Sequence, residues 1–245
     1  MPSLLLVFVF LLITINAISQ EFFSEKNPPP GTILLEENYY LDKREVTNID
    51  YREYQYWVMR VYGENSEKFN STVLDHSALK GTLGVDEDYY YDRAYDLYPV
   101  VGVTWEQAVD FANWRTDRVV EMQLIQRGVV SMHPEQTAEN HFTYRKYLNG
   151  EYLDYSPIVQ LEVAIYSLPT KAEWDNVIVK HNKFDPEKHK KFQINKNKGN
   201  PLNGPRITGY QNIKGMPASD LYGNVAEMIR EKGKAKGGSW MHDLE

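Results

Sequence analysis

The sequence predicts an irregular fold that contains both helices and short extended segments, in one large domain or two small ones. Aromatic residues make up 13% of the 245 residues, and the chain carries 15 glycines and 12 prolines. Such a composition suits an irregular, aromatic-rich domain better than a helical bundle. Three capped helical segments, separated by extended runs and long loops, support the same fold class. At this length, a hydrophobic fraction of 42% can bury a core.

Three segments begin with a threonine that is followed, three residues later, by an acidic or amide side chain. The pairs are Thr47 with Asp50, Thr104 with Gln107, and Thr170 with Glu173. In such a capping box, the threonine oxygen accepts a first-turn amide and the second side chain reaches back to the cap. Apolar residues at helical spacing then predict one buried face behind each of the first two caps. These residues are Tyr51, Tyr54, Val58 and Val61 in the first helix, and Trp105, Ala108, Phe111, Ala112 and Val119 in the second.

The remaining segments are predicted as strands, extended runs and loops. Residues 31–46 indicate two short strands or extended pieces, and residues 98–103 and 161–169 are extended runs that lead into the second and third helices. Residues 63–97 and 128–160 show no sustained periodicity, and we expect ordered loops because their tyrosines need packing partners.

The N-terminus is typical of a targeting segment. Leu4–Ile15 is an apolar stretch too short to span a bilayer comfortably, and small residues follow it. We therefore expect a signal peptide at 1–19, a proline-rich lead-in at 20–31 and one domain at 32–245. The expected location is outside the cytoplasm, periplasmic or secreted. Membrane attachment would come only through the signal segment, if it stays uncleaved.

Charge and cysteine content exclude several function classes. The net charge of −7 argues against nucleic-acid binding, because there is no basic surplus to neutralise a phosphate backbone. The basic run at 180–198 is expected to be a solvated loop. The chain has no cysteine, which excludes disulfides, thiol chemistry and a cysteine-linked lipid anchor within these residues.

Five segments, in this order, resemble one family, the formylglycine-generating enzyme or sulfatase-modifying-factor domain. They are LDKREVTNIDYREY (41–54), YPVVGVTWEQAVDFANWRT (98–116), YSLPTKAEWD (166–175), DLYGNVAEM (220–228) and KGGSW (236–240). The resemblance implies an irregular α+β fold related to C-type lectins, here lacking the C-terminal part that follows KGGSW. The second segment is most similar to a branch of exported proteins of bacterial gliding motility and its secretion machinery.

The resemblance also implies a structural Ca²⁺ site at the Gly-Asn-x-x-Glu turn. Its ligands would be the carbonyls of Tyr222, Gly223 and Val225 and the side chain of Glu227. Oxygen ligands of this kind suit Ca²⁺, and glycine lets successive carbonyls point inward. Without the resemblance, the segment would be interpreted as a simple turn whose Glu227 caps a helix or faces solvent. The segment at 197–217 does not match the family's second Ca²⁺ site, for which Asn212 and Asp220 are the candidate ligands.

The resemblance implies that the Gly-Gly-Ser-Trp run is a buried strand, and the alternative is a Gly-rich turn with one core Trp. In the enzymes of this family, two cysteines just after the run bind copper and activate oxygen. Here MHDLE follows instead. We therefore expect no catalytic residue, no copper and no other redox cofactor.

The histidines do not form a metal-binding motif that could replace the cysteines, since no two of the six are three or four residues apart. Each is expected to be a surface or loop residue. They are His76, His133, His141, His181, His189 and His242. The acidic tyrosine cluster at 86–96 is expected to be an exposed loop.

Three functions remain open. The first is a non-enzymatic binding or scaffold component of the cell envelope, with a protein or an envelope component as partner. The second is the N-terminal fragment of a formylglycine-generating oxidase that acts on a sulfatase cysteine, which the gene sequence beyond codon 245 would reveal. The third is a lectin-like carbohydrate-binding module, which rests on fold analogy alone.

Overall fold

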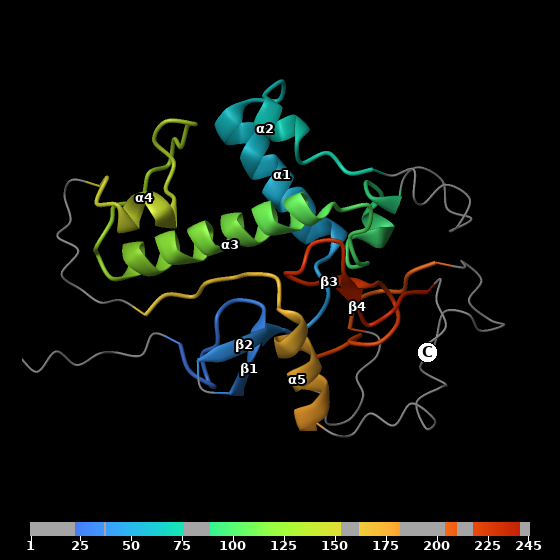
Figure 1. Ribbon diagram of the computed structural model, residues 1–245. Coiled ribbons are helices and arrows are strands. Elements are labelled where there is room, and N and C mark those ends of the chain that lie inside the picture. Colours follow the sequence, from blue (N-terminus) through green and yellow to red (C-terminus); the bar gives the residue numbers. More distant parts are fainter. Residues whose placement is uncertain are drawn as a thin grey trace, which may run out of the picture.

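The computed structural model describes residues 23–36, 38–75, 89–152, 162–181, 204–209 and 218–240. Helices α1 (Asn48–Tyr62) and α3 (Trp105–Gln126) cross in one half of the molecule. The hairpin of β1 (Thr32–Glu36) and β2 (Tyr39–Asp42) lies on the other side of α3, next to α5 (Lys171–His181) (Figure 1). The other elements are α2 (Glu67–Asn70), η3 (Arg93–Tyr95), α4 (Tyr144–Leu148), β3 (Glu227–Met228) and β4 (Ala235–Lys236).

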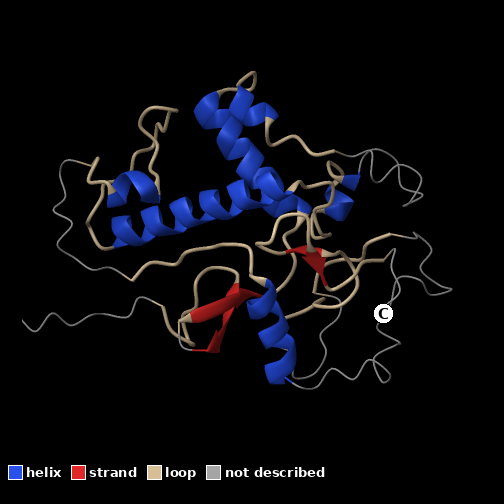
Figure 2. Ribbon diagram, viewed as in Figure 1, coloured by secondary structure: helices blue, strands red, loops and turns tan. Residues whose placement is uncertain are grey.

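Loops connect these short elements throughout (Figure 2), as the predicted irregular α+β class requires. Each of the two sheets within the described ranges has two antiparallel strands. The β1–β2 hairpin confirms the strands expected at 31–46, and its register shifts between Leu34 and Glu36. The run at 98–103 is also extended, and Pro99 forms an isolated bridge with Thr47 at the start of α1.

All three predicted helix starts are confirmed by reciprocal hydrogen bonds. At α1, the Asp50 amide donates to Thr47 Oγ1 over 3.3 Å and the Thr47 amide donates to Asp50 Oδ2 over 2.9 Å. The same exchange caps α3 at Thr104 and Gln107. At α5, the Thr170 amide donates to the Glu173 carboxylate over 2.6 Å. These caps form from neighbouring residues alone, which is why the sequence predicts them.

The main core lies between α1 and α3. The predicted face of α1 is buried at all four positions, Tyr51, Tyr54, Val58 and Val61. On α3 the prediction holds fully only for Phe111, because Trp105, Ala108, Ala112 and Val119 are half-buried. The C-terminal half of α3 instead buries Val120 and Leu124 against Phe142, in a second cluster formed with the loop that precedes α4.

Two of the expected loops contain short helices. Each begins with its own side-chain cap, as when Ser66 Oγ accepts the Phe69 amide in front of α2. Helices of three to five residues leave no periodic pattern in the sequence.

The expectation of an exposed loop at 86–96 is wrong for Tyr89 and Tyr90, which are 3% and 1% exposed. Their hydroxyls donate to the Pro99 carbonyl and to Gln55 Oε1, both over 2.7 Å, so partners distant in sequence bury them.

The Gly-Gly-Ser-Trp run is not a strand. Strand β4 ends at Lys236, and Gly237 and Gly238 have positive φ angles of 83° and 70°. A Cβ at Gly237 would lie 2.9 Å from the carbonyl oxygen of Leu221. The glycines therefore form a turn that passes close to the loop at 218–225, and the close backbone approach expected from glycine is confirmed.

The signal-peptide prediction at 1–19 lies outside the described residues, as do Asn212 and most of the basic run at 180–198. Among the helices that the structure describes, none has the length and apolar character needed to cross a membrane.

Candidate functional site

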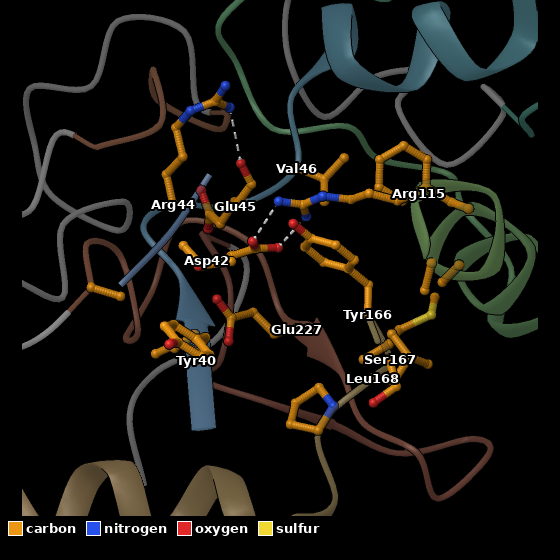
Figure 3. A pocket seen from close by; sticks show the side chains of 18 of the residues that line it. Tyr40, Asp42, Arg44, Glu45, Val46, Arg115, Tyr166, Ser167, Leu168 and Glu227 are labelled. Atoms are coloured by element: carbon orange, nitrogen blue, oxygen red, sulfur yellow. Dashed lines mark hydrogen bonds and ion pairs between the residues drawn. The ribbon is translucent and has the colours of Figure 1, made fainter. Parts of the chain in front are cut away.

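A cavity of about 820 Å³ lies beside the β1–β2 hairpin. Its walls come from β2, from α3, from the extended segment at 162–169, from the turn at 218–228, and from Ser239 and Trp240. Pockets of this size commonly take small ligands or parts of larger ones. Figure 3 shows Asp42 of β2, Arg115 of α3, Tyr166 of the extended segment and Glu227 of β3 gathered at the cavity.

One wall of the cavity is held rigid by Arg115. Its guanidinium donates to the two carboxylate oxygens of Asp42 over 2.7 and 2.8 Å, and to the Pro30 carbonyl over 2.7 Å. It also lies 4.1 Å from the centre of the Tyr166 ring. This two-point pairing with a ring beneath it locks both the hairpin and residue 166 onto α3 (Figure 3).

Two carboxyl groups at the cavity, those of Glu45 and Glu227, have no cationic partner among the described residues. Glu45 is 7% exposed, and its oxygens accept hydrogen bonds from Asn224 Nδ2 over 2.6 Å and from the Val225 amide over 3.2 Å. Glu227 Oε2 accepts the Trp174 indole N–H over 3.0 Å. Neither group forms an ion pair with any residue that the structure describes.

Burial makes these carboxyl groups weak acids. Removal from water raises the pKa of Glu45 well above its usual value, and the charges of Glu227 and Asp220 raise it further. Burial likewise raises the pKa of Glu227 to about 7. Part of the Glu227 surface remains open because the side chain borders the cavity, while its carboxyl group is enclosed by protein atoms. A cation bound near these acids would relieve the cost of burying their charge.

The Gly-Asn-x-x-Glu turn is fixed from two sides. The Gly223 amide donates to the Gly237 carbonyl over 2.8 Å, and the Trp240 amide donates to the Asn224 carbonyl over 2.9 Å. Gly223 and Asn224 both have positive φ, at 80° and 50°. The Asn224 side chain accepts from the Arg206 amide over 2.7 Å and donates to the Arg206 carbonyl over 3.2 Å. Because its amide is fully engaged, Asn224 cannot rotate away from Glu45.

The structure places the four predicted Ca²⁺ ligands, Tyr222, Gly223, Val225 and Glu227, on this one turn and the first residue of β3. Within the described ranges, the carbonyls of Gly223 and Val225 accept no hydrogen bond. Asp220, the guess for a second site, lies nearby, is 3% exposed and accepts the Gly209 amide. No group of three His, Cys, Asp or Glu side chains in the described part of the chain could hold a metal ion. A cation here would therefore depend on backbone carbonyls and a single carboxylate.

Sequence reasoning missed Glu45, Asp42, Arg115 and Trp174 as parts of one site. Their partners are distant along the chain: 179 positions separate Glu45 from Asn224. Glu45 did leave a weak signal, since it is an acid two residues before Thr47, the buried cap of α1. The expectation of a surface or loop position is met by His141, which lies in a loop, although its side chain is only 6% exposed. Its ring contacts the Tyr62 hydroxyl and the Thr137 carbonyl, both at 3.0 Å.

A family model described as "Sulfatase-modifying factor enzyme 1-like domain" matches residues 13–245. The match includes every segment that builds the cavity and the turn. No curated protein and no solved structure shows significant similarity to the chain.

Proposed function

Since this chain belongs to the sulfatase-modifying factor enzyme 1-like family, we propose that it is an exported binding or scaffold component of the cell envelope that uses the family's fold without thiol chemistry. The observation that carries the proposal is the complete lack of cysteine in the 245 residues, together with a cavity lined by carboxyl, aromatic and apolar groups. The likeness of residues 98–116 to exported gliding-motility proteins favours a gliding or secretion assembly as the setting.

The chemistry of the side chains supports binding over oxidation. A soft metal such as copper is held by thiolates, and the chain supplies none, so no step through copper is derived. The groups that border the cavity can hold and orient a ligand instead. Arg115 and Asp42 form hydrogen bonds with each other. Glu45 and Glu227 carry acceptor oxygens, and donors of the protein, Asn224 Nδ2 and the Trp174 indole, hold them in place.

The test is oxygen consumption by the purified chain with a cysteine-containing peptide, followed by mass spectrometry of the peptide. The proposal predicts no oxygen uptake and an unmodified cysteine after incubation with copper. Turnover would refute it. The rival reading, an N-terminal fragment of an oxidase, gains support if the gene continues in frame beyond codon 245 and encodes two cysteines there.

We further propose that the turn at 222–227 holds a structural Ca²⁺. Support comes from the carbonyl oxygens of Gly223 and Val225, which accept no hydrogen bond from the described residues, and from the carboxyl group of Glu227, which has no cationic partner among them. A bound Ca²⁺ would supply positive charge beside the buried acids and so stabilise the fold. Calorimetric melting with added Ca²⁺ or with a chelator tests this: the site is empty if the melting temperature is the same in both.

A further inference from the structure

The extended segment at 162–169 has a directional pattern of backbone hydrogen bonds. The Tyr166 amide donates to Thr116 Oγ1 over 2.9 Å, and the Tyr166 carbonyl oxygen lies 3.3 Å from the same hydroxyl, which also donates to the Ala112 carbonyl over 3.0 Å. Both backbone groups of Tyr166 therefore point toward α3. In an extended chain, the N–H and C=O of one residue point to one side, and those of the next residue point to the other. The backbone groups of Ile165 and Ser167 accordingly point away from α3.

We call the side of this segment that points away from α3 the outer edge, and within the described ranges it is paired at one end only. The Pro169 carbonyl accepts the Arg230 amide over 2.8 Å, just past β3. Toward the N-terminus, the amides and carbonyls of Val163, Ile165 and Ser167 form no hydrogen bond with any residue in the described ranges. All three residues line the cavity. In Figure 1 the segment runs between α3 and the β1–β2 hairpin.

We propose that this edge binds an extended polypeptide strand of a partner protein, which pairs main chain to main chain with residues 163–167. The inference rests on the proposed binding function and names its partner class. Donors and acceptors repeat every second residue, roughly 7 Å apart, which is the spacing that another strand presents. The pairing at Pro169 shows where the added strand would continue an existing contact. The adjoining cavity would take side chains from one face of that strand.

The probe is a library of short random peptides displayed on phage and selected on the full chain, with an enriched peptide then made synthetically. Amide hydrogen exchange on the wild-type complex is the first readout. Protection should appear at the amides of Ile165 and Ser167, which point to the open edge, and should change least at Ala164. A peptide held only by its side chains in the cavity would not produce this alternation.

Matched variants provide the second readout. Ile165→Pro removes the amide at the open edge and should weaken peptide binding about tenfold. Ile165→Ala keeps the amide but loses the side chain, and Ala164→Pro removes an amide that points the other way. Both controls should stay within about threefold of wild type. Circular dichroism checks that each variant is folded. If a proline variant does not fold, the hydrogen-exchange pattern of the wild-type complex alone tests the proposal.

The proposal is overturned if no peptide is enriched over an unrelated bait, if protection shows no alternation, or if Ile165→Pro binds as tightly as wild type. These results leave the proposed function intact, because a binding component can use another surface. Oxidation of a cysteine peptide by the chain would instead refute the proposed function, and it would leave the proposal of strand pairing unaffected.

Discussion

Replacement of Glu227 by glutamine should remove a loss of stability that the metal-free protein suffers between acid and neutral pH. Burial raises the pKa of Glu227 from 4.5 to about 7 in the folded state. The folded protein therefore holds this proton more tightly than the unfolded chain does. Stability from the group is full below pH 4.5 and is lost as the pH rises to about 7.

The size of this effect follows from the pKa values. At about 1.36 kcal/mol for each pH unit, the rise from 4.5 to about 7 corresponds to a loss of about 3 kcal/mol of unfolding free energy. Glutamine carries no charge at any pH, and its carbonyl oxygen can still accept the Trp174 indole N–H. The difference in stability between variant and wild type should thus grow by about 3 kcal/mol between pH 4.5 and pH 8, in favour of the variant.

The assay is urea unfolding followed by tryptophan fluorescence across this pH range, with a chelator present throughout. Added Ca²⁺ provides a second arm at pH 8. It should stabilise the wild type, by about 3 kcal/mol at a hundredfold excess over its dissociation constant, and leave Glu227→Gln unchanged. Parallel pH profiles for the two proteins would refute the assignment of Glu227 as a buried, uncompensated acid.

Three further changes have defined outcomes. Glu45→Gln should lower the free energy of unfolding in urea by about 1–3 kcal/mol. The new amide nitrogen must face either the Val225 amide or Asn224 Nδ2, and both of these are donors. A variant as stable as the wild type would contradict this. Gly237→Ala should lower the melting temperature far more than Gly233→Ala, since both have positive φ but only the first Cβ meets another atom within 4 Å. Burial lowers the pKa of His141, so its neutral form is favoured and stability is lost as the pH falls below about 6.5. His141→Gln should flatten that acid-side loss, and an unchanged slope would rule out this role.

Local features of the fold were predictable from the sequence, and the caps at Thr47, Thr104 and Thr170 show why. Each cap depends on two side chains three residues apart, so neighbouring residues contain all the information. The buried face of α1 was equally readable, since Tyr51, Tyr54 and Val58 follow a helical period in the sequence.

The site depends on contacts between distant segments, and sequence reasoning recovered little of it. The family resemblance located the turn at 222–227, but nothing local showed that Glu45 would tie Asn224 and Val225 in place. Tyr89 and Tyr90 look exposed among acidic neighbours, yet hydroxyl partners elsewhere in the fold allow them to be buried. Local patterns cannot specify such contacts, because their free energy depends on residues brought together only by folding.

The central claim is that this family member binds without oxidising thiols. The most direct test is an oxygen-electrode measurement on the purified chain, with copper and a cysteine-containing peptide, beside an active formylglycine-generating enzyme as a positive control. The account predicts oxygen uptake only in the control. Sustained uptake by this chain, with conversion of the peptide cysteine to an aldehyde, would contradict it.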